Sequence, residues 1–153
     1  MTDFEASDPA FAERIHDSFD RQGFMHYIGA ELTAVTPGHC EIRVSYRDEL
    51  SQQHDFFHGG IIGAIADNSA GYASYTLMGA DDSILTVEYK LNIMAPGKGD
   101  TLVSRAHVIK AGRTLSVSRA DVFAVTDGAE VLCATAQVTL MRLAGRADTP
   151  STA

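Results

Sequence analysis

The chain has 153 residues, of which 45% are hydrophobic, and this content is enough for one compact domain with a hydrophobic core. Its formal net charge of −8, without a basic stripe, argues against nucleic-acid binding. No apolar run approaches the ~18 residues of a membrane span, and the acidic N-terminus has no hydrophobic signal core, so we expect a cytoplasmic protein that has no membrane partner.

The N-terminal part, residues 1–29, is expected to form one helix and a connector. Apolar residues recur at helical spacing in residues 8–22, which predicts a short amphipathic helix. Gly23 should end this helix, and residues 24–28 should form an apolar connector that folds over the core.

Alternation of apolar and polar residues predicts six strands, two before and four after a long helix. The predicted strands are 31–36, 40–47, 85–94, 101–110, 114–125 and 131–142. Turn residues separate them, and Asp127-Gly128 is a strong hairpin signal. Because the connections are short, we expect an α+β fold in which an antiparallel sheet curls around the helix. The remaining residues, 144–153, are small and polar and are expected to be disordered.

Two cysteines, Cys40 and Cys133, lie in alternating apolar segments of these strands. They indicate small buried residues in a reducing compartment rather than a disulfide framework.

The longest predicted helix extends to Met78 and organises the chain. Its side chains are small or apolar apart from a few neutral polar ones, and Asp67 is the only charge. Gly59 and Gly60 should open the helix, and Gly79 should cap its end. Since such a helix has no broad solvated face, the rest of the protein should wrap around it.

Asp67 is the first candidate site residue. A buried carboxylate is costly unless a partner or a reaction uses it, although a structural hydrogen bond to a neighbouring strand or loop would also explain it. The Gly59-Gly60 helix start favours function, because bare amides at a helix N-terminus attract a developing oxyanion. An oxyanion site together with a carboxylate predicts acyl transfer to water.

The spacing of these groups predicts a shared site. Asp67 lies eight residues beyond Gly59, about 12 Å along a helix axis at ~1.5 Å per residue. Both groups must approach one carbonyl carbon to roughly 3 Å, which a single helix cannot arrange. Two antiparallel copies could supply one group each, with Gly63 at the midpoint allowing the helices to approach closely. We therefore predict a homodimer with shared active sites.

Several segments carry a family resemblance. They are QQHDFFHGG at 52–60, Asp67-Asn68, TVEYKLN at 86–92 and Ala95-Pro96. Together they resemble the PaaI-type acyl-CoA thioesterases, which have the hotdog fold, a curved antiparallel β-sheet wrapped around a long central α-helix. The similarity covers about residues 24–142 and implies a hotdog thioesterase domain over residues 30–143. The general fold pattern alone is less specific, because dehydratases and acyl-binding regulators share it.

The resemblance implies hydrolysis of an aryl or short- or medium-chain acyl-CoA to free acid and CoA, without a metal or other cofactor. Gly59 matches the glycine whose backbone N–H polarises the thioester carbonyl. Asp67 matches the acid that acts as nucleophile or as general base on water, and the sequence does not decide between these roles. His58 matches a histidine that helps orient the thioester, while a structural hydrogen bond between loop and helix is an equal alternative.

Two more catalytic positions follow from the resemblance. Gln52 stands where relatives often carry Asn, and its amide, or that of Gln53, would hold the water or the carbonyl. Thr86 stands where some relatives have a Ser that positions the water, although Thr is also common in strands for other reasons.

Five residues are expected to bind substrate. Gly60 and Asn68 follow the two catalytic positions Gly59 and Asp67 directly in sequence. Three residues fall in the region that lies along the nucleotide groove of similar proteins, where cations would bind the CoA phosphates; the alternative is ordinary solvated side chains. These three are Lys90, Asn92 and Arg113.

Two further groups of side chains could form a metal site or an aromatic pocket. His54, Asp55 and His58 have a spacing that could bind zinc, but a catalytic site needs about three protein ligands and an open position, so we predict no metal. Aromatic side chains near the helix could line an acyl pocket or pack in the core. They are Phe56, Phe57, Tyr72 and Tyr75.

A non-catalytic acyl-CoA binding or sensing protein is the competing interpretation and would use the same groove. The buried acid Asp67, with Gln52 and Thr86, favours an enzyme. Hydratase action would require a His general base paired with the acid, and no such arrangement is evident. The sequence does not distinguish a dimer from a dimer of dimers, which hotdog relatives commonly form.

Overall fold

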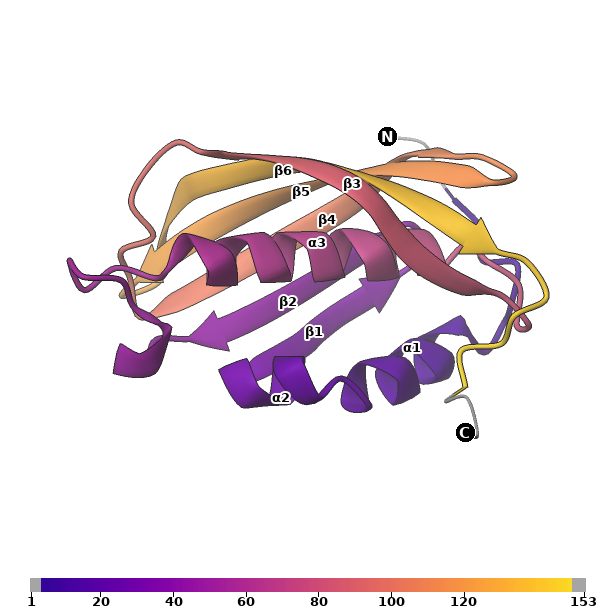
Figure 1. The fold of residues 1–153 in the computed structure, drawn as a ribbon, viewed down its shortest axis with the longest axis horizontal. Coiled ribbons are helices and arrows are strands. Elements are labelled where there is room, and N and C mark those ends of the chain that lie inside the picture. The colour runs from indigo at the N-terminus through magenta and orange to yellow at the C-terminus, as the bar shows by residue number, and fades with distance from the viewer. Residues whose placement is uncertain (1–3, 150–153) are drawn as a thin grey trace.

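Six strands form a curved antiparallel sheet around a long helix in the computed structural model, which describes residues 4–149 (Figure 1). The elements in chain order are α1 (Phe11–Asp20), α2 (Gly23–Ile28), β1 (Ala30–Thr36), β2 (His39–Ser45), the 3-10 helix η1 (Asp48–Leu50), α3 (Gly59–Tyr75), β3 (Ser83–Ile93), β4 (Thr101–Ala111), β5 (Leu115–Thr126) and β6 (Ala129–Leu143). The strand order is β1-β2-β4-β5-β6-β3, and all paired strands are antiparallel. The predicted α+β architecture and its six strands are confirmed.

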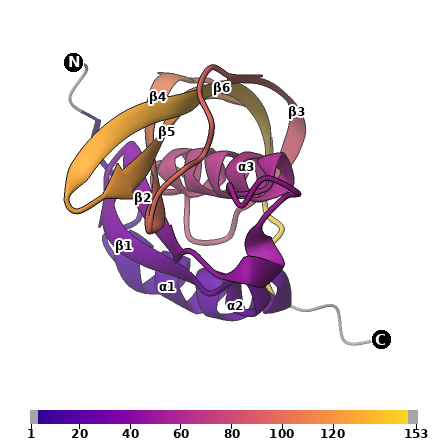
Figure 2. The ribbon, with the colours of Figure 1, turned by 90° about the vertical axis from the view of Figure 1, so that its left-hand side faces the viewer.

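Helix α3 lies inside the curve of the sheet, and α1 and α2 lie on the side of α3 away from β5 and β6 (Figure 2). The residues of α3 that face the core are almost fully buried; they include Ile62, Ile65, Ala66, Ala70 and Ala73. Two hydroxyl pairs connect the helix to the sheet, Ser69 with Ser104 at 2.7 Å and Ser74 with Ser118 at 2.8 Å. These four buried hydroxyl groups are therefore satisfied, and small side chains let α3 pack closely against β4 and β5.

The C-terminal end of α3 differs from the prediction. The helix ends at Tyr75 instead of continuing to Met78, and Gly79 does not cap it. Thr76 ends it, because its hydroxyl donates to the carbonyl of Ala73 at 2.7 Å and accepts from the N–H of Gly38 at 2.7 Å. This tertiary bond to the β1–β2 turn has no signature in the local sequence.

The N-terminal part contains two helices rather than one helix and a connector. Gly23 begins α2, so it separates two helices, and Gly29 ends α2 with φ of 69°. The predicted apolar faces are confirmed, since both helices bury residues against the core. The buried residues are Ile15, Phe19, Met25 and Ile28.

The hairpin between β5 and β6 forms where the sequence predicts it. Asp127 and Gly128 both have positive φ, 49° and 80°. Two consecutive residues with positive φ match the right-handed twist of a two-residue hairpin, and Asp-Gly favours this turn. Both cysteines, Cys40 and Cys133, are buried and free, as expected.

The C-terminal segment is described as far as Thr149, and residues 150–153 lie outside the described residues. The carboxylate of Asp148 accepts hydrogen bonds from Ser18 of α1 and from Arg21, the residue that follows α1. These contacts hold Asp148 beside the end of α1, and the disorder expected for residues 144–153 stays a prediction. Within residues 4–149, no helix combines the length and the apolar character that crossing a membrane requires.

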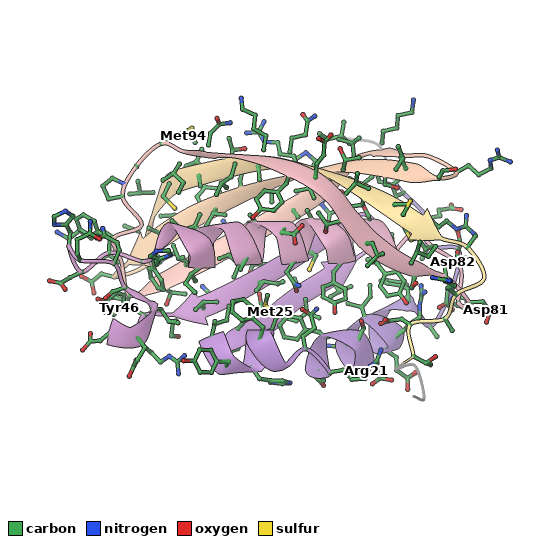
Figure 3. All side chains as sticks on the ribbon, in the orientation of Figure 1. Arg21, Met25, Tyr46, Asp81, Asp82 and Met94 are labelled. Carbon is green, nitrogen blue, oxygen red and sulfur yellow. The ribbon has the colours of Figure 1, made fainter. Side chains whose placement is uncertain are left out.

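Asp82 fixes the turn that leads from α3 into β3 (Figure 3). Its carboxylate is buried, accepts from the N–H groups of Gly79 at 2.9 Å and Gly145 at 3.1 Å, and forms an ion pair with Arg142 at 2.7 Å. Three partners on two chain segments converge on this carboxylate, so it sets where β3 begins.

We predict that Asp82→Ala lowers the free energy of unfolding by about 3 kcal/mol, because two N–H groups and one guanidinium lose their acceptor. Urea unfolding measures the effect. The exposed neighbour Asp81 is the matched control, and Asp81→Ala should change stability by less than about 0.5 kcal/mol. Equal losses in the two variants would contradict the role of Asp82.

Candidate functional site

Asp67 lies on the half-buried side of α3. Residues of this side recur at helical spacing; they are Ile61, Ala64, Asp67, Asn68 and Gly71. Thr86 of β3 donates a hydrogen bond from Oγ1 to Oδ1 of Asp67 at 2.8 Å. In the part of the chain that the structure describes, no ion pair reaches this carboxylate and no donor contacts Oδ2. The carboxylate is thus oriented by the strand, as the structural alternative requires, and it also keeps a free oxygen.

Burial raises the pKa of the Asp67 carboxyl, and the hydrogen bond from Thr86 opposes this rise. A carboxylate in this state holds a proton more readily than one in water. It is therefore suited to accept a proton from a water molecule or to act as a partly desolvated nucleophile.

A β-bulge places Thr86 next to Asp67. The pairing of β3 with β6 shifts between Thr86 and Glu88, so Val87 is the extra residue. Farther along β3, the side chains of Tyr89, Leu91 and Ile93 face glycines of α3. Side chains alternate along a strand, so residues 86 and 89 face the same side only because of this bulge.

The start of α3 presents one free amide. His58 caps the helix, because its Nδ1 accepts from the N–H of Gly60 at 2.9 Å and its carbonyl accepts from Ile61 at 2.9 Å and Ile62 at 3.3 Å. Among residues 4–149, the N–H of Gly59 has no acceptor. The structural role considered for His58 is therefore observed, and it leaves Gly59 as the donor available to a ligand.

Glycine at position 60 is required by this cap. A Cβ atom added to Gly60 would lie 2.9 Å from Nδ1 of His58, too close for the hydrogen bond to persist. At Gly59 an added Cβ would meet only the flexible end of Ile93, at 3.2 Å.

The structure does not bring Gly59 and Asp67 of one chain together. Both lie on the uninterrupted helix α3, which separates them by about 12 Å. Gly63, at the midpoint, is buried against Tyr89 and Leu91 of its own chain. The prediction that Gly63 admits a partner helix is therefore wrong, because its missing side chain accommodates β3.

Gln52 lies in the loop before α3, and its Oε1 accepts from the N–H of His54 at 2.7 Å. This bond stabilises a tight loop in which Asp55 has a positive φ of 59°. The amide oxygen is therefore used within the loop, while its NH2 group has no acceptor within the described residues. Gln53 is exposed.

A cavity of about 460 Å³ lies beside Asp67 and Thr86. Two of the four aromatic residues considered for a pocket, Tyr72 and Tyr75, line it. Phe57 does not, because it is buried edge-on against Tyr46 at a centroid distance of 5.3 Å. Asn68 lines the cavity and donates from Nδ2 to Oε1 of Gln22 at 2.9 Å.

Part of the cavity wall was missed by the sequence analysis. It comes from α1, from the two residues between α1 and α2, and from the C-terminal segment, none of which carries a recognisable motif. These residues are Ser18, Arg21, Gln22, Asp148 and Thr149.

The residues expected to bind the CoA phosphates lie elsewhere. Lys90 and Asn92 share one face of β3, as predicted, but this is the outer face of the sheet, opposite to Tyr89 and Leu91, which face α3. There they line a separate hollow of about 420 Å³, together with Arg119. Arg113 is exposed in the β4–β5 turn. The structure therefore does not bring Lys90 or Asn92 beside Asp67.

The potential metal ligands do not converge either. In the described ranges, no three His, Cys, Asp or Glu side chains are grouped so that they could hold a metal ion. His54, Asp55 and His58 are all exposed.

Strand β3 has an exposed, apolar edge. It pairs with β6 on one side only, so its other edge is free in the described chain. Its large apolar side chains are exposed to between 47% and 54%; they are Leu85, Val87, Tyr89, Ile93 and the following Met94. A long apolar edge strand is normally covered by another strand or protein.

Comparisons with known proteins identify the family and the fold. A family model described as the thioesterase superfamily matches residues 54–139. A crystal structure of a thioesterase family protein from Silicibacter pomeroyi is 41% identical, covers 87% of this chain and 98% of its own, and has a TM-score of 0.85. A thioesterase structure from Haemophilus influenzae, 20% identical, covers 84% of this chain and 87% of its own with a TM-score of 0.75, and it shares the fold. The expected hotdog arrangement is thus confirmed.

A human relative matches a shorter stretch. Human acyl-coenzyme A thioesterase 13 is 32% identical over 94 residues, which are 59% of this chain and 64% of the human protein.

The raised pKa of Asp67 predicts a stability penalty at neutral pH. A carboxyl with a raised folded-state pKa contributes stability below its unfolded-state pKa, and this contribution is lost as the pH rises through the folded-state pKa. Asp67→Asn stays neutral, so its Tm should exceed that of the wild type at neutral pH, and the difference should shrink on acidification. Asp20→Asn, an exposed change of the same charge on α1, is the control for thermal unfolding. An equal gain in both variants, or a lower Tm for Asp67→Asn, would contradict the prediction.

Proposed function

Because this chain belongs to the thioesterase superfamily, we propose that it hydrolyses the thioester bond of an acyl-CoA to a free acid and CoA. Family membership supports thioester hydrolysis in general. The CoA portion is supported by the name of the human relative, an acyl-coenzyme A thioesterase. The observation that carries the proposal is Asp67, a half-buried carboxylate that Thr86 of β3 orients and that no cation contacts within residues 4–149. The helix that carries Asp67 begins with the N–H of Gly59, which has no acceptor in the same range.

Polarisation of the thioester is assigned to the start of α3. The N–H of Gly59 donates a hydrogen bond to the thioester oxygen, and the positive end of the helix dipole stabilises the negative charge that develops there. His58 keeps the neighbouring amides occupied, so the ligand oxygen meets a single well-defined donor.

The attack on the carbonyl carbon is assigned to Asp67. As general base, it accepts a proton from the attacking water; as nucleophile, it forms an acyl-enzyme anhydride that water then hydrolyses. In both routes the C–S bond breaks, the electron pair leaves with the sulfur, and the thiolate of CoA takes up a proton. Thr86 holds one carboxylate oxygen, so the other points to the reaction centre.

A homodimer supplies both groups to each site in this proposal. The edge of β3 supports it, because the exposed apolar side chains and unpaired backbone of that edge would be covered by the same edge of a second copy. Figure 1 shows that β3 runs back along α3. A two-fold axis at the middle of β3 therefore also places the two α3 helices antiparallel, with Gly59 of each facing toward Asp67 of the other.

We predict that Asp67→Ala and Gly59→Pro each reduce kcat/KM by at least ~10²-fold, since one removes the base or nucleophile and the other removes the N–H donor. Proline is tolerated at the first position of a helix, and His58 has the φ of −61° and ψ of 138° that a residue before proline prefers. Thiol release from a panel of aryl, short-chain and medium-chain acyl-CoAs measures the loss.

Gly59→Ala is the matched control for Gly59→Pro. It adds the same Cβ next to Ile93 but keeps the N–H, so it should retain activity within roughly tenfold. Hydrolysis that survives Asp67→Ala within a few-fold would remove the proposed chemistry. Binding of CoA thioesters without any thiol release by the wild type would instead identify a binding or sensing protein.

We predict that mixing two inactive variants restores activity. In a mixed dimer of Asp67→Asn and Gly59→Pro chains, one site combines the intact Gly59 of the first chain with the intact Asp67 of the second. Random pairing would recover about a quarter of the wild-type rate, because half of the dimers are mixed and each has one complete site. Co-expression with two different affinity tags isolates the mixed dimer. If each chain formed its site alone, the mixture would stay inactive.

A further inference from the structure

The cavity beside Asp67 and Thr86 is also lined by two residues of the C-terminal segment, Asp148 and Thr149. Five further lining residues are apolar or aromatic; they are Tyr72, Tyr75, Ile84, Leu85 and Leu140. A cavity of about 460 Å³ with such a lining is suited to the acyl part of a small ligand.

A hydrogen-bonded chain that runs in a single direction connects α3, through Gln22 between α1 and α2 and Ser18 of α1, to the C-terminal segment. Nδ2 of Asn68 donates to Oε1 of Gln22 at 2.9 Å, and Nε2 of Gln22 donates to the hydroxyl of Tyr72 at 2.6 Å. The Tyr72 hydroxyl donates to Oγ of Ser18 at 3.1 Å, and Ser18 donates to the carboxylate of Asp148. Because an ionised carboxylate only accepts, Asp148 fixes the direction of every donor before it.

Arg21 holds the C-terminal segment against α1 at the end of this chain. Its NH2 group donates to the carboxylate of Asp148 at 2.9 Å and to the carbonyl of the same residue at 2.6 Å. In Figure 3, Arg21 lies beside the last described residues of the chain. The side chains of Arg21 and Asp148 are 43% and 39% exposed, so solvent screens the pair, it contributes little to stability, and its loss should not unfold the domain.

We propose that residues 144–149 form the end wall of the acyl pocket and that the Arg21–Asp148 ion pair limits the length of the acyl group that the pocket accepts. The inference rests on the proposed function, because it assigns the acyl group of the substrate to this cavity. The substrates are then acyl-CoAs whose acyl group ends before the ion pair, which are aryl, short-chain or medium-chain thioesters.

The physical basis of the limit is the contact that a longer chain would have to break. An acyl group that starts at Asp67 and continues past Tyr72 meets Ser18, Arg21 and Asp148. Its apolar end would desolvate these groups without forming a hydrogen bond to them, or it would displace the segment from α1. When the ion pair is removed, the pocket opens at this end and a longer chain can extend into solvent.

The test compares straight-chain acyl-CoAs of increasing length as substrates of the wild type, Arg21→Ala and Asp148→Ala. For the first homologue that the wild type rejects, kcat/KM relative to the best wild-type substrate should rise by about tenfold or more in both variants, the discrimination that one methylene group gives in a closed pocket. The charge-swapped double variant, Arg21→Asp with Asp148→Arg, should return the length profile toward that of the wild type. Arg146→Ala, an exposed change in the same segment that does not line the cavity, is the control and should leave the profile unchanged.

An unchanged length profile in both single variants, with wild-type hydrolysis intact, would overturn the end wall and leave the proposed function standing. If the wild type releases no thiol from any acyl-CoA, the proposed function fails. The end wall is then tested by binding of free carboxylic acids of increasing length in a thermal shift assay. A longer cut-off in Asp148→Ala than in the wild type supports the wall, and an identical cut-off overturns it.

Discussion

The hydrogen bond from Thr86 to Asp67 is the contact on which the site depends. A half-buried carboxylate without a cation is costly, and within residues 4–149 this is the single donor that reaches it. The bond forms because the bulge at Val87 turns Thr86 toward α3 while Tyr89 faces the same side. The sheet thus orients the acid without neutralising it, and one oxygen keeps its capacity to act on a ligand. A fully paired carboxylate would be more stable and less reactive.

At the start of α3, too, most hydrogen-bonding groups have partners and one is left free. His58 satisfies the amides of three following residues with two acceptors, and the N–H of Gly59 is left over. Because α3 is rigid and uninterrupted, the free amide and Asp67 stay about 12 Å apart and cannot act on one carbonyl in one chain. In the proposed dimer, the exposed apolar edges of the two β3 strands cover each other. The same pairing brings the free amide of Gly59 in one copy toward Asp67 of the other.

Patterns that depend on neighbouring residues predicted the fold well, and contacts between distant segments could not be predicted. The strands, the Asp127-Gly128 turn and the unusual position of Asp67 follow from alternation, turn chemistry and charge. The end of α3 depends on a bond from Thr76 to a turn about forty residues earlier, so local sequence extended the helix too far. The sequence predicted that Lys90 and Asn92 share one face of β3. It did not predict that this face points away from Asp67, because the bulge at Val87 changes the alternation of side chains between Thr86 and Lys90. The cavity wall formed by Ser18, Arg21 and Gln22, at the end of α1 and just after it, has no signature, since Ser, Arg and Gln are ordinary residues of an exposed helix end.

The division between the two parts of the site has a consequence for specificity. The family match covers residues 54–139, which contain the start of α3, Asp67 and Thr86. The wall that includes Ser18, Arg21 and Asp148 comes from segments on either side of that match. The groups assigned to the reaction thus belong to the region that defines the family, whereas the end of the pocket is built from the flanking segments. In the proposed enzyme, reaction chemistry and acyl-group selection can therefore change independently, because a different N-terminal helix or C-terminal segment would reshape the pocket without moving the carboxylate or the amide.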